Sequence, residues 1–176
     1  MDERDSMRAL VEAQRHGVLC TAHTGLGGWS FGSVVPYVLD PHGDPLVFLS
    51  DLAEHTRNVR RDGRASLFVA DPAAAERPQA GARVTLLVRA AQPHTDELAA
   101  AEACYFAAFP GAAAMRQAHG FHVYRLEVDQ VRWIAGFGSM GWIDRAHWSG
   151  EPDPLAAHAT AIVAHMNEDH GDAIGE

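Results

Sequence analysis

Four of the 14 arginines lie within eight residues of one another, among and after hydroxyl, amide and carboxylate side chains at positions 50–58. They are Arg57, Arg60, Arg61 and Arg64. On a helix, residues three, four or seven positions apart share a face, and Thr56 falls on the opposite, apolar side. Guanidinium groups beside a hydroxyl and an amide suit a phosphate monoester, because arginine presents forked donors. The other interpretation is a solvated basic face with Thr56 filling the core, and the segment by itself favours it.

The histidines are densest at residues 165–170, His-Met-Asn-Glu-Asp-His. His165 and His170 are five residues apart, which turns them off a common helix face and excludes a His-Glu-x-x-His zinc site. We interpret this segment as a polar helix face. The alternative is that His165 or His170 provides an imidazole ligand to haem iron. No other metal site is predicted.

Residues 136–141 match the pattern Gly-x-Gly-x-x-Gly. A dinucleotide-binding loop with this pattern must open a helix and lead to a second parallel strand. The 35 residues after Gly141 include a Pro-Asp-Pro sequence and no such strand. We therefore interpret the glycines as a tight turn that ends a strand and lets the backbone approach another strand or a flat ligand closely.

The two cysteines, Cys20 and Cys104, fall in a predicted strand and in an alanine-rich predicted helix. Both are interpreted as packing residues rather than nucleophiles. The sequence shows no arrangement typical of a Ser-His-Asp triad.

The elements that would position these residues are short strands with helices inserted between them. Apolar spacing predicts helices at 7–14, 51–62 and 95–109, a short helix ending near 119, and strands at 18–23, 30–39, 46–49, 65–70, 83–91 and 121–135. Asp51 and Glu54 form a capping box for the second helix, Thr95 is a candidate cap of the third, and His16-Gly17 ends the first. The first connections are too short for parallel crossovers. The pattern predicts an α+β, mainly β fold: a small antiparallel barrel of about six strands with peripheral helices.

Composition limits the classes of function. The 176 residues include 14 arginines, no lysine and 23 acidic residues, for a net charge of −9. An acidic chain lacks the positive field that non-specific nucleic-acid binding requires. The charged start has no signal-peptide core, and no apolar run is long enough to span a membrane. A cytoplasmic protein without a nucleic-acid or membrane partner is expected.

The composition changes after Trp148. Residues 149–154 read as a linker, and residues 155–174 as one more helix. We expect a barrel domain at 1–148, followed at 149–176 by the linker and the start of a truncated C-terminal helical module.

Several motifs together resemble a known family. The main ones are Arg-x-Gly-Val-Leu-x-Thr at 15–21, Gly-Ser-Val-Val-Pro-Tyr at 32–37 and Leu-Ser-x-Leu-Ala-x-His-Thr-x-Asn at 49–58, with further matches at 83–86, 109–110, 121–126 and 136–138. Their order and spacing resemble the pyridoxamine-5′-phosphate-oxidase-like split β-barrel proteins, and the haem-utilisation branch most closely. Residues 165–170 are similar to the start of a helical module that accompanies the barrel in that branch.

The resemblance implies a six-stranded antiparallel split β-barrel that forms a homodimer, with FMN in clefts at the dimer interface. Ser33 and Val34 would contact the flavin ring. Its phosphate would be surrounded by Ser50, Thr56, Arg57 and Asn58. With the resemblance, a phosphate site is therefore favoured over a solvated basic face for this segment. Trp133, Gly136 and Gly138 would come from the other subunit.

The chain also departs from the family. Without lysine it lacks a residue often used in the flavin sites of pyridoxamine-phosphate oxidases, and the substrate-binding arginine and histidine pattern of those enzymes is absent. Both points argue against oxidation of pyridoxamine phosphate itself. The first hypothesis is an FMN-dependent oxidoreductase or flavin carrier. The alternatives are a haem-binding or haem-degrading protein and a cofactor-free protein-binding module.

Overall fold

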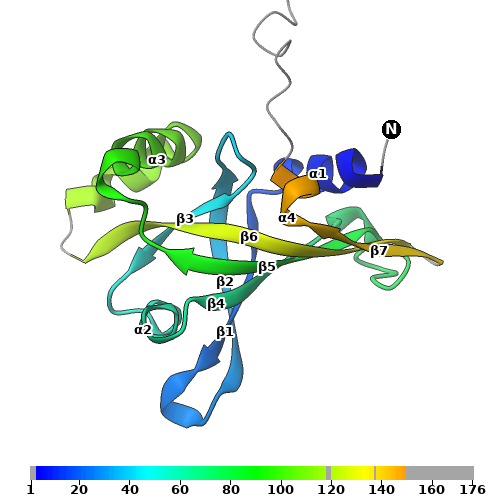
Figure 1. Ribbon diagram of the computed structural model, residues 1–176, viewed down its shortest axis with the longest axis horizontal. Helices are drawn as coiled ribbons and strands as arrows, with labels where there is room; N and C mark the ends of the chain where they lie inside the picture. Colours follow the sequence, from blue (N-terminus) through cyan, green and yellow to red (C-terminus); the bar gives the residue numbers. More distant parts are fainter. Residues whose placement is uncertain (1–2, 118–119, 137, 150–176) are drawn as a thin grey trace, which may run out of the picture.

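Seven strands form one antiparallel sheet in the computed structural model, which describes residues 3–117, 120–136 and 138–149 (Figure 1). The strands are β1 (His16–His23), β2 (Trp29–Leu39), β3 (Pro45–Ser50), β4 (Arg64–Ala70), β5 (Arg83–Ala91), β6 (Phe121–Gly136) and β7 (Ser139–Asp144). Their order in the sheet is β3-β2-β1-β4-β5-β6-β7.

The sheet closes because β3 pairs with β6, which makes a ring of β1 to β6. Residues 121–125 of β6 pair with β3, and residues 130–136 pair with β7 along the same edge. The sheet therefore splits between β3 and β7. The split-barrel prediction is confirmed, but the seventh strand was not predicted, because the glycines at 136–141 were interpreted only as a turn.

Helices lie around the ring. They are α1 (Glu3–Ala13), α2 (Glu54–Arg61), α3 (Thr95–Ala108) and α4 (Arg145–Ser149), with 3-10 turns η1 (Thr24–Leu26), η2 (Pro72–Ala74) and η3 (Pro110–Gln117). Figure 1 shows α3 on one side of the ring, α1 and α4 together at its upper end and α2 below α3. No helix in the described part of the chain is long and apolar enough to cross a membrane.

The interior of the ring is filled by alternate residues of the strands. Leu19, Leu67, Leu86 and Leu126 are fully buried, each from a different strand. Trp148 of α4 closes one end of this core, and its Nε1 donates a hydrogen bond to the carbonyl of Gly43 at 3.0 Å. A second apolar cluster lies outside the ring, where Ala101 and Tyr105 of α3 cover part of β3 and β6.

The expected end of the first helix was wrong. The helix ends at Ala13, and His16-Gly17 begins β1 instead of forming a left-handed cap. A Cβ on Gly17 would lie 2.9 Å from the carbonyl oxygen of Phe68. Glycine is needed at this position because β4 passes so close to it.

The predicted caps of the second and third helices were also wrong. The N-cap of α2 is Ala53, because the backbone N–H of Asp51 donates to the carbonyl of Gly120 at 2.6 Å and holds Asp51 away from the helix end. The carboxylate of Asp51 instead pairs with Arg60. Thr95 is the first residue of α3, and His94 occupies its N-cap position.

Candidate functional site

The side chains predicted to surround a phosphate lie between the end of β3 and the middle of α2. The hydroxyl of Ser50 accepts a hydrogen bond from the backbone N–H of Leu52 at 3.2 Å. Arg57 donates to the Glu54 carboxylate at 2.7 Å and to the Leu52 carbonyl at 2.9 Å. Both side chains therefore have partners within this short segment.

Asn58 and Thr56 belong to α2, and their side chains are fully buried on the inner side of this helix. Asn58 Nδ2 donates to Thr21 Oγ1 at 3.0 Å, and Asn58 Oδ1 accepts from the backbone N–H of Thr24 at 3.4 Å. The Thr56 hydroxyl is enclosed without a hydrogen-bond partner in the described part of the chain. The sequence-based placement of Thr56 on the apolar side of the helix is confirmed.

The other arginines of the group are also engaged. Arg60 pairs with Asp51 and donates from Nε to the Tyr124 hydroxyl at 3.0 Å, and Arg61 lies 3.4 Å from the Thr24 hydroxyl. The bonds that Arg64 donates lower the pKa of the Asp62 carboxyl to about 2. Each of these three arginines thus has a carboxylate or hydroxyl partner in the same chain.

These contacts bear on how well FMN fits. Three of the four predicted phosphate ligands, Ser50, Arg57 and Asn58, already have internal partners, and the fourth, Thr56, is enclosed. Arg57 and Ser50 keep further donors, so a phosphate on Arg57 would share the guanidinium with the Glu54 carboxylate. Thr56 and Asn58 are enclosed, so only part of the predicted phosphate site is accessible as folded.

The two residues predicted to contact the flavin ring point to opposite sides of the sheet, as consecutive strand residues do. Ser33 lies opposite Leu19, which is fully buried, and so faces inward. Val34 faces outward and is 70% exposed. Only Val34 is available on the outer surface.

The residues predicted to come from a second subunit lie at the far end of β6. Trp133 is 4% exposed and packs in the core, where a Cβ on Gly141 would come within 2.9 Å of its indole. Gly136 and Gly138 have φ of 142° and 87° in the turn to β7, so the tight-turn interpretation is confirmed. Figure 1 shows this turn and α2 at opposite sides of one chain. The predicted haem ligands His165 and His170 lie outside the described residues.

Both cysteines are half-buried packing residues, as predicted. Cys20 lies in β1, and Cys104 in α3 has its Sγ 3.7 Å from the Leu39 carbonyl. Burial raises the pKa of the Cys104 thiol, which disfavours the reactive thiolate.

A row of outward-facing side chains crosses six adjacent strands, and no sequence motif marks these residues as a group. Each residue lies directly opposite the next: Val34 (β2), Val18 (β1), Phe68 (β4), Thr85 (β5), Arg132 (β6) and Trp142 (β7). We call this row the outer strip. With strands about 4.8 Å apart, the row runs for about 24 Å along the curved surface of the barrel.

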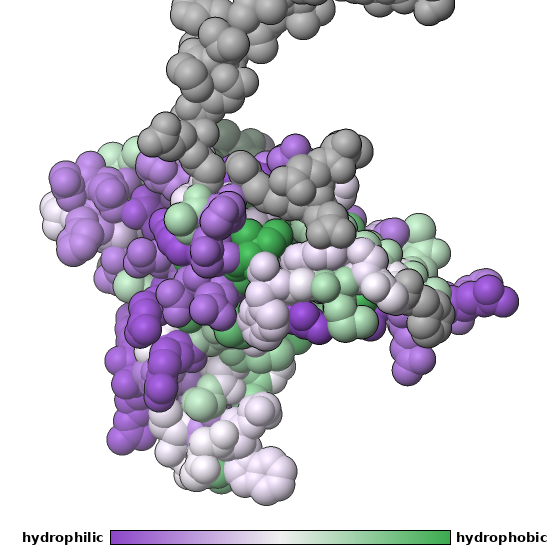
Figure 2. Space-filling model, turned by 45° about the vertical axis from the view of Figure 1, so that its right-hand side comes forward, coloured by the Kyte–Doolittle hydropathy of each residue, from purple (hydrophilic) through white to green (hydrophobic). Residues whose placement is uncertain are grey.

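The outer strip is largely apolar, and three of its side chains are exposed among the residues that the structure describes. Val34, Phe68 and Trp142 are 70%, 37% and 58% exposed. Arg132 lies on β6, between β5 and β7. Its guanidinium is 5.5 Å from the Trp142 ring centroid and donates to the Gly141 carbonyl at 3.2 Å. In Figure 2 the β1–β2 hairpin, at the bottom of the molecule, is mostly pale with some green, and the largest group of purple atoms lies above it and to its left.

Its sequence signal was weak. Strands β4 and β5 carry apolar residues on both faces, which looks like ordinary strand propensity, and β7 was hidden behind the glycine turn. Only the register shows that these residues share one row.

The comparisons with known proteins identify the family. A family model described as CREG, beta-barrel, matches residues 2–150. The chain belongs to the CREG β-barrel family. Over 172 residues it is 28% identical to the non-canonical heme oxygenase HOZ, chloroplastic, of Arabidopsis thaliana. This match covers 94% of the chain and 52% of the Arabidopsis protein, so the chain spans about half of that relative's length.

Two solved structures place the fold. A heme binding protein from Mycobacterium smegmatis matches with a TM-score of 0.78 and 36% identity over 97% of this chain and 69% of that chain. A Clostridium acetobutylicum protein related to general stress protein 26, of the pyridoxinephosphate oxidase family, matches with a TM-score of 0.63 and 10% identity over 82% of this chain and 96% of that one. The second likeness shows the split-barrel fold alone.

Proposed function

We propose that this protein binds haem on the outer strip and takes part in haem utilisation. The observation that carries the proposal is the strip itself, where exposed apolar side chains lie in one row with an arginine. The relatives described as a heme oxygenase and a heme binding protein support it. The haem-utilisation branch is therefore preferred over the flavin oxidoreductases.

The strip suits the two chemical parts of haem. Val34, Phe68 and Trp142 would pack against the apolar macrocycle. Arg132 has no carboxylate partner among the described residues, and its guanidinium would pair with a haem propionate. Bound haem would supply iron that binds and activates dioxygen.

The predicted axial ligand is His165 or His170. An imidazole is a common ligand of haem iron, and both residues follow the barrel in the sequence. Spectra of His165→Ala and His170→Ala would identify it, because loss of the axial ligand moves the haem absorption bands.

We further propose that the protein is a homodimer with the cofactor cleft at the interface. An exposed apolar strip about 24 Å long is unusual on a monomer. A second copy facing the strip would bury the parts that haem leaves uncovered.

FMN binding by Ser33, Val34, Ser50, Thr56, Arg57, Asn58, Trp133, Gly136 and Gly138 stays a prediction. The internal partners of Arg57 and Asn58 weigh against it. A cofactor-free protein-binding module is the third hypothesis, and it predicts that neither haem nor FMN is taken up.

Haem titration followed by absorption tests the proposed site. Phe68→Glu places a charge in the middle of the strip and should weaken haem binding at least tenfold, because burying an unpaired carboxylate is costly. Met115→Glu, an exposed methionine outside the strip, should bind as the wild type does. Unchanged haem affinity in a folded Phe68→Glu protein would remove the strip from the site.

A further inference from the structure

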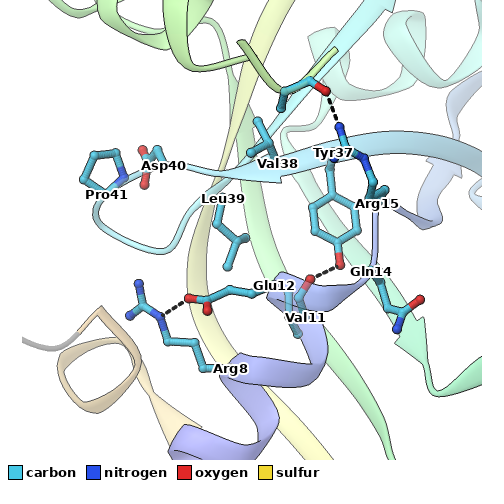
Figure 3. Close-up of a pocket in the computed structure, with 11 residues that line it drawn as sticks. Arg8, Val11, Glu12, Gln14, Arg15, Tyr37, Val38, Leu39, Asp40 and Pro41 are labelled. Carbon is cyan, nitrogen blue, oxygen red and sulfur yellow. Dashed lines mark hydrogen bonds and ion pairs between the residues drawn. The ribbon is translucent and has the colours of Figure 1, made fainter. Parts of the chain in front are cut away.

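A cavity of about 350 Å³ opens between α1, the end of β2 and the end of α3, away from the outer strip (Figure 3). Arg8 and Arg15 stand at its two ends, with Leu39 and Tyr37 between them. Its volume lies at the small end of the range for ligand sites, which is about 300–1,000 Å³. The cavity contains none of the residues predicted to bind FMN or haem.

The floor of the cavity is apolar and rigid. Val11 and Tyr37 are buried, and the Tyr37 hydroxyl donates to the Val11 carbonyl at 2.6 Å, which fixes the ring against α1. Leu39 is partly buried beside them and adds an aliphatic surface. A ligand lying here would contact hydrocarbon along most of its length.

One arginine of the cavity lacks an ion-pair partner. Arg8 pairs with Glu12 at 3.0 Å. Asp40 lies 3.0 Å from Arg125, which also pairs with Glu97, and Asp40 accepts two backbone N–H bonds within its own turn. Arg15 has no carboxylate partner among the residues that the structure describes, although acidic residues outnumber arginines in this chain.

Arg15 is also held in place. Its guanidinium lies 4.6 Å from the Phe109 ring centroid and donates from Nη2 to the Ala108 carbonyl. That hydrogen bond accounts for one of the five N–H donors of an arginine. A positioned guanidinium with further donors loses little freedom when it binds a carboxylate.

From these observations we propose that the cavity binds a small monocarboxylic acid with an apolar body. The carboxylate pairs with Arg15, and the hydrocarbon lies on Val11, Tyr37 and Leu39. A single arginine without an ion-pair partner, with Glu12 and Asp40 also in the lining, favours one carboxylate over a dicarboxylate or a phosphate ester. The site does not depend on the haem proposal.

Titration with hexanoate and hexanamide, followed by ligand-observed NMR and calorimetry, tests the wild-type protein directly. Hexanoate should bind saturably at one site per chain, and hexanamide at least tenfold more weakly, because only the acid carries the charge that Arg15 would meet. Equal binding of the two, or no saturable binding of hexanoate, would overturn the proposal.

Variants locate the site. Arg15→Gln should weaken hexanoate binding at least tenfold, and Arg15→Lys should restore part of the loss. Arg116→Gln is the matched control, because Arg116 also lies over a phenylalanine, Phe106, but away from the cavity. Hexanoate affinity unchanged by Arg15→Gln would refute the assignment, and unaltered haem affinity in the same variant would keep the two proposals separate. If Arg15→Gln fails to fold, the hexanoate and hexanamide comparison decides.

Discussion

Asn58 is a structural residue in this fold. Its amide joins α2 to β1 through Thr21 and to η1 through Thr24, and it is fully enclosed. Arg57, the preceding residue, lies on the surface and donates to Glu54 and Leu52 of its own segment. Adjacent residues that the family resemblance assigned to one phosphate thus have different surroundings.

Asn58→Ala should lower the free energy of unfolding by about 2 kcal/mol, because it leaves buried polar partners unpaired. Arg57→Ala should change it little, since exposed ion pairs contribute little. Urea unfolding of both variants checks this difference. Equal losses of stability would contradict it.

His55 gives α2 a pH response. Burial lowers the pKa of His55 from its ordinary value near 6.5, so the folded state favours the neutral ring. The unfolded chain then binds the proton more readily, and stability present above pH 6.5 is lost as the pH falls below it. Stability should therefore decline between pH 7 and pH 5.

His55→Gln should flatten that decline, whereas His94→Gln, an exposed residue, should leave it as in the wild type. Denaturant unfolding at several pH values measures both. A decline of the same size in His55→Gln would show that other groups cause it.

For single residues, the sequence predicted which side chains are buried better than it predicted their hydrogen-bond and ion-pair partners. Helical spacing alone placed Thr56 on the apolar side. The partners of Arg60 could not be predicted, because Tyr124 is 64 residues away and reaches α2 only once β6 has paired with β3.

The long strand β6 pairs with β3, β5 and β7. The ion pair between Asp44 and Arg145 joins the middle of β6 to the β2–β3 turn and to α4. Asp44, in the β2–β3 turn, is 2% exposed and accepts from Arg145 at 2.6 Å and from the Val128 backbone N–H at 2.9 Å. Arg145 also donates to the Val128 carbonyl at 2.9 Å. The pair connects the β2–β3 turn, β6 and the start of α4.

Asp44→Asn should destabilise the protein by about 3 kcal/mol, because it leaves the Arg145 charge half-buried without its counter-ion. Asp62→Asn, which breaks the exposed pair with Arg64, is the control and should have little effect. Thermal and urea unfolding measure both variants. A small loss in Asp44→Asn would mean that the pair is not needed to hold the turn.

Most elements were predictable from apolar alternation and turn residues. All six strands of the ring were located, and β5 was placed at its observed bounds. β7 was missed because its six residues follow Gly136 and Gly138 and include Gly141. The cap of α2 was missed because a backbone bond to Gly120, just before β6, holds Asp51 away from the helix end.

In the part of the chain that the structure describes, α3 covers one part of the outer sheet surface, and the outer strip stays partly exposed. If two copies face each other across the strip, Trp142→Glu should shift the protein to monomers at micromolar concentration, because a buried charge opposes association. Light scattering measures the mass, with Met115→Glu as a control. A dimer in Trp142→Glu, or a monomeric wild type, would contradict the shared cleft. The cytoplasmic location stays a prediction, and one relative is described as chloroplastic.

The absorption spectrum of the wild-type protein, equilibrated with equal amounts of haem and FMN and then freed of unbound ligand, tests the central claim most directly. Haem binding predicts a Soret band in the recovered protein, with one haem or fewer per chain and no flavin absorption. A flavin spectrum without a Soret band would contradict the haem proposal and restore the FMN hypothesis. A colourless protein would contradict both.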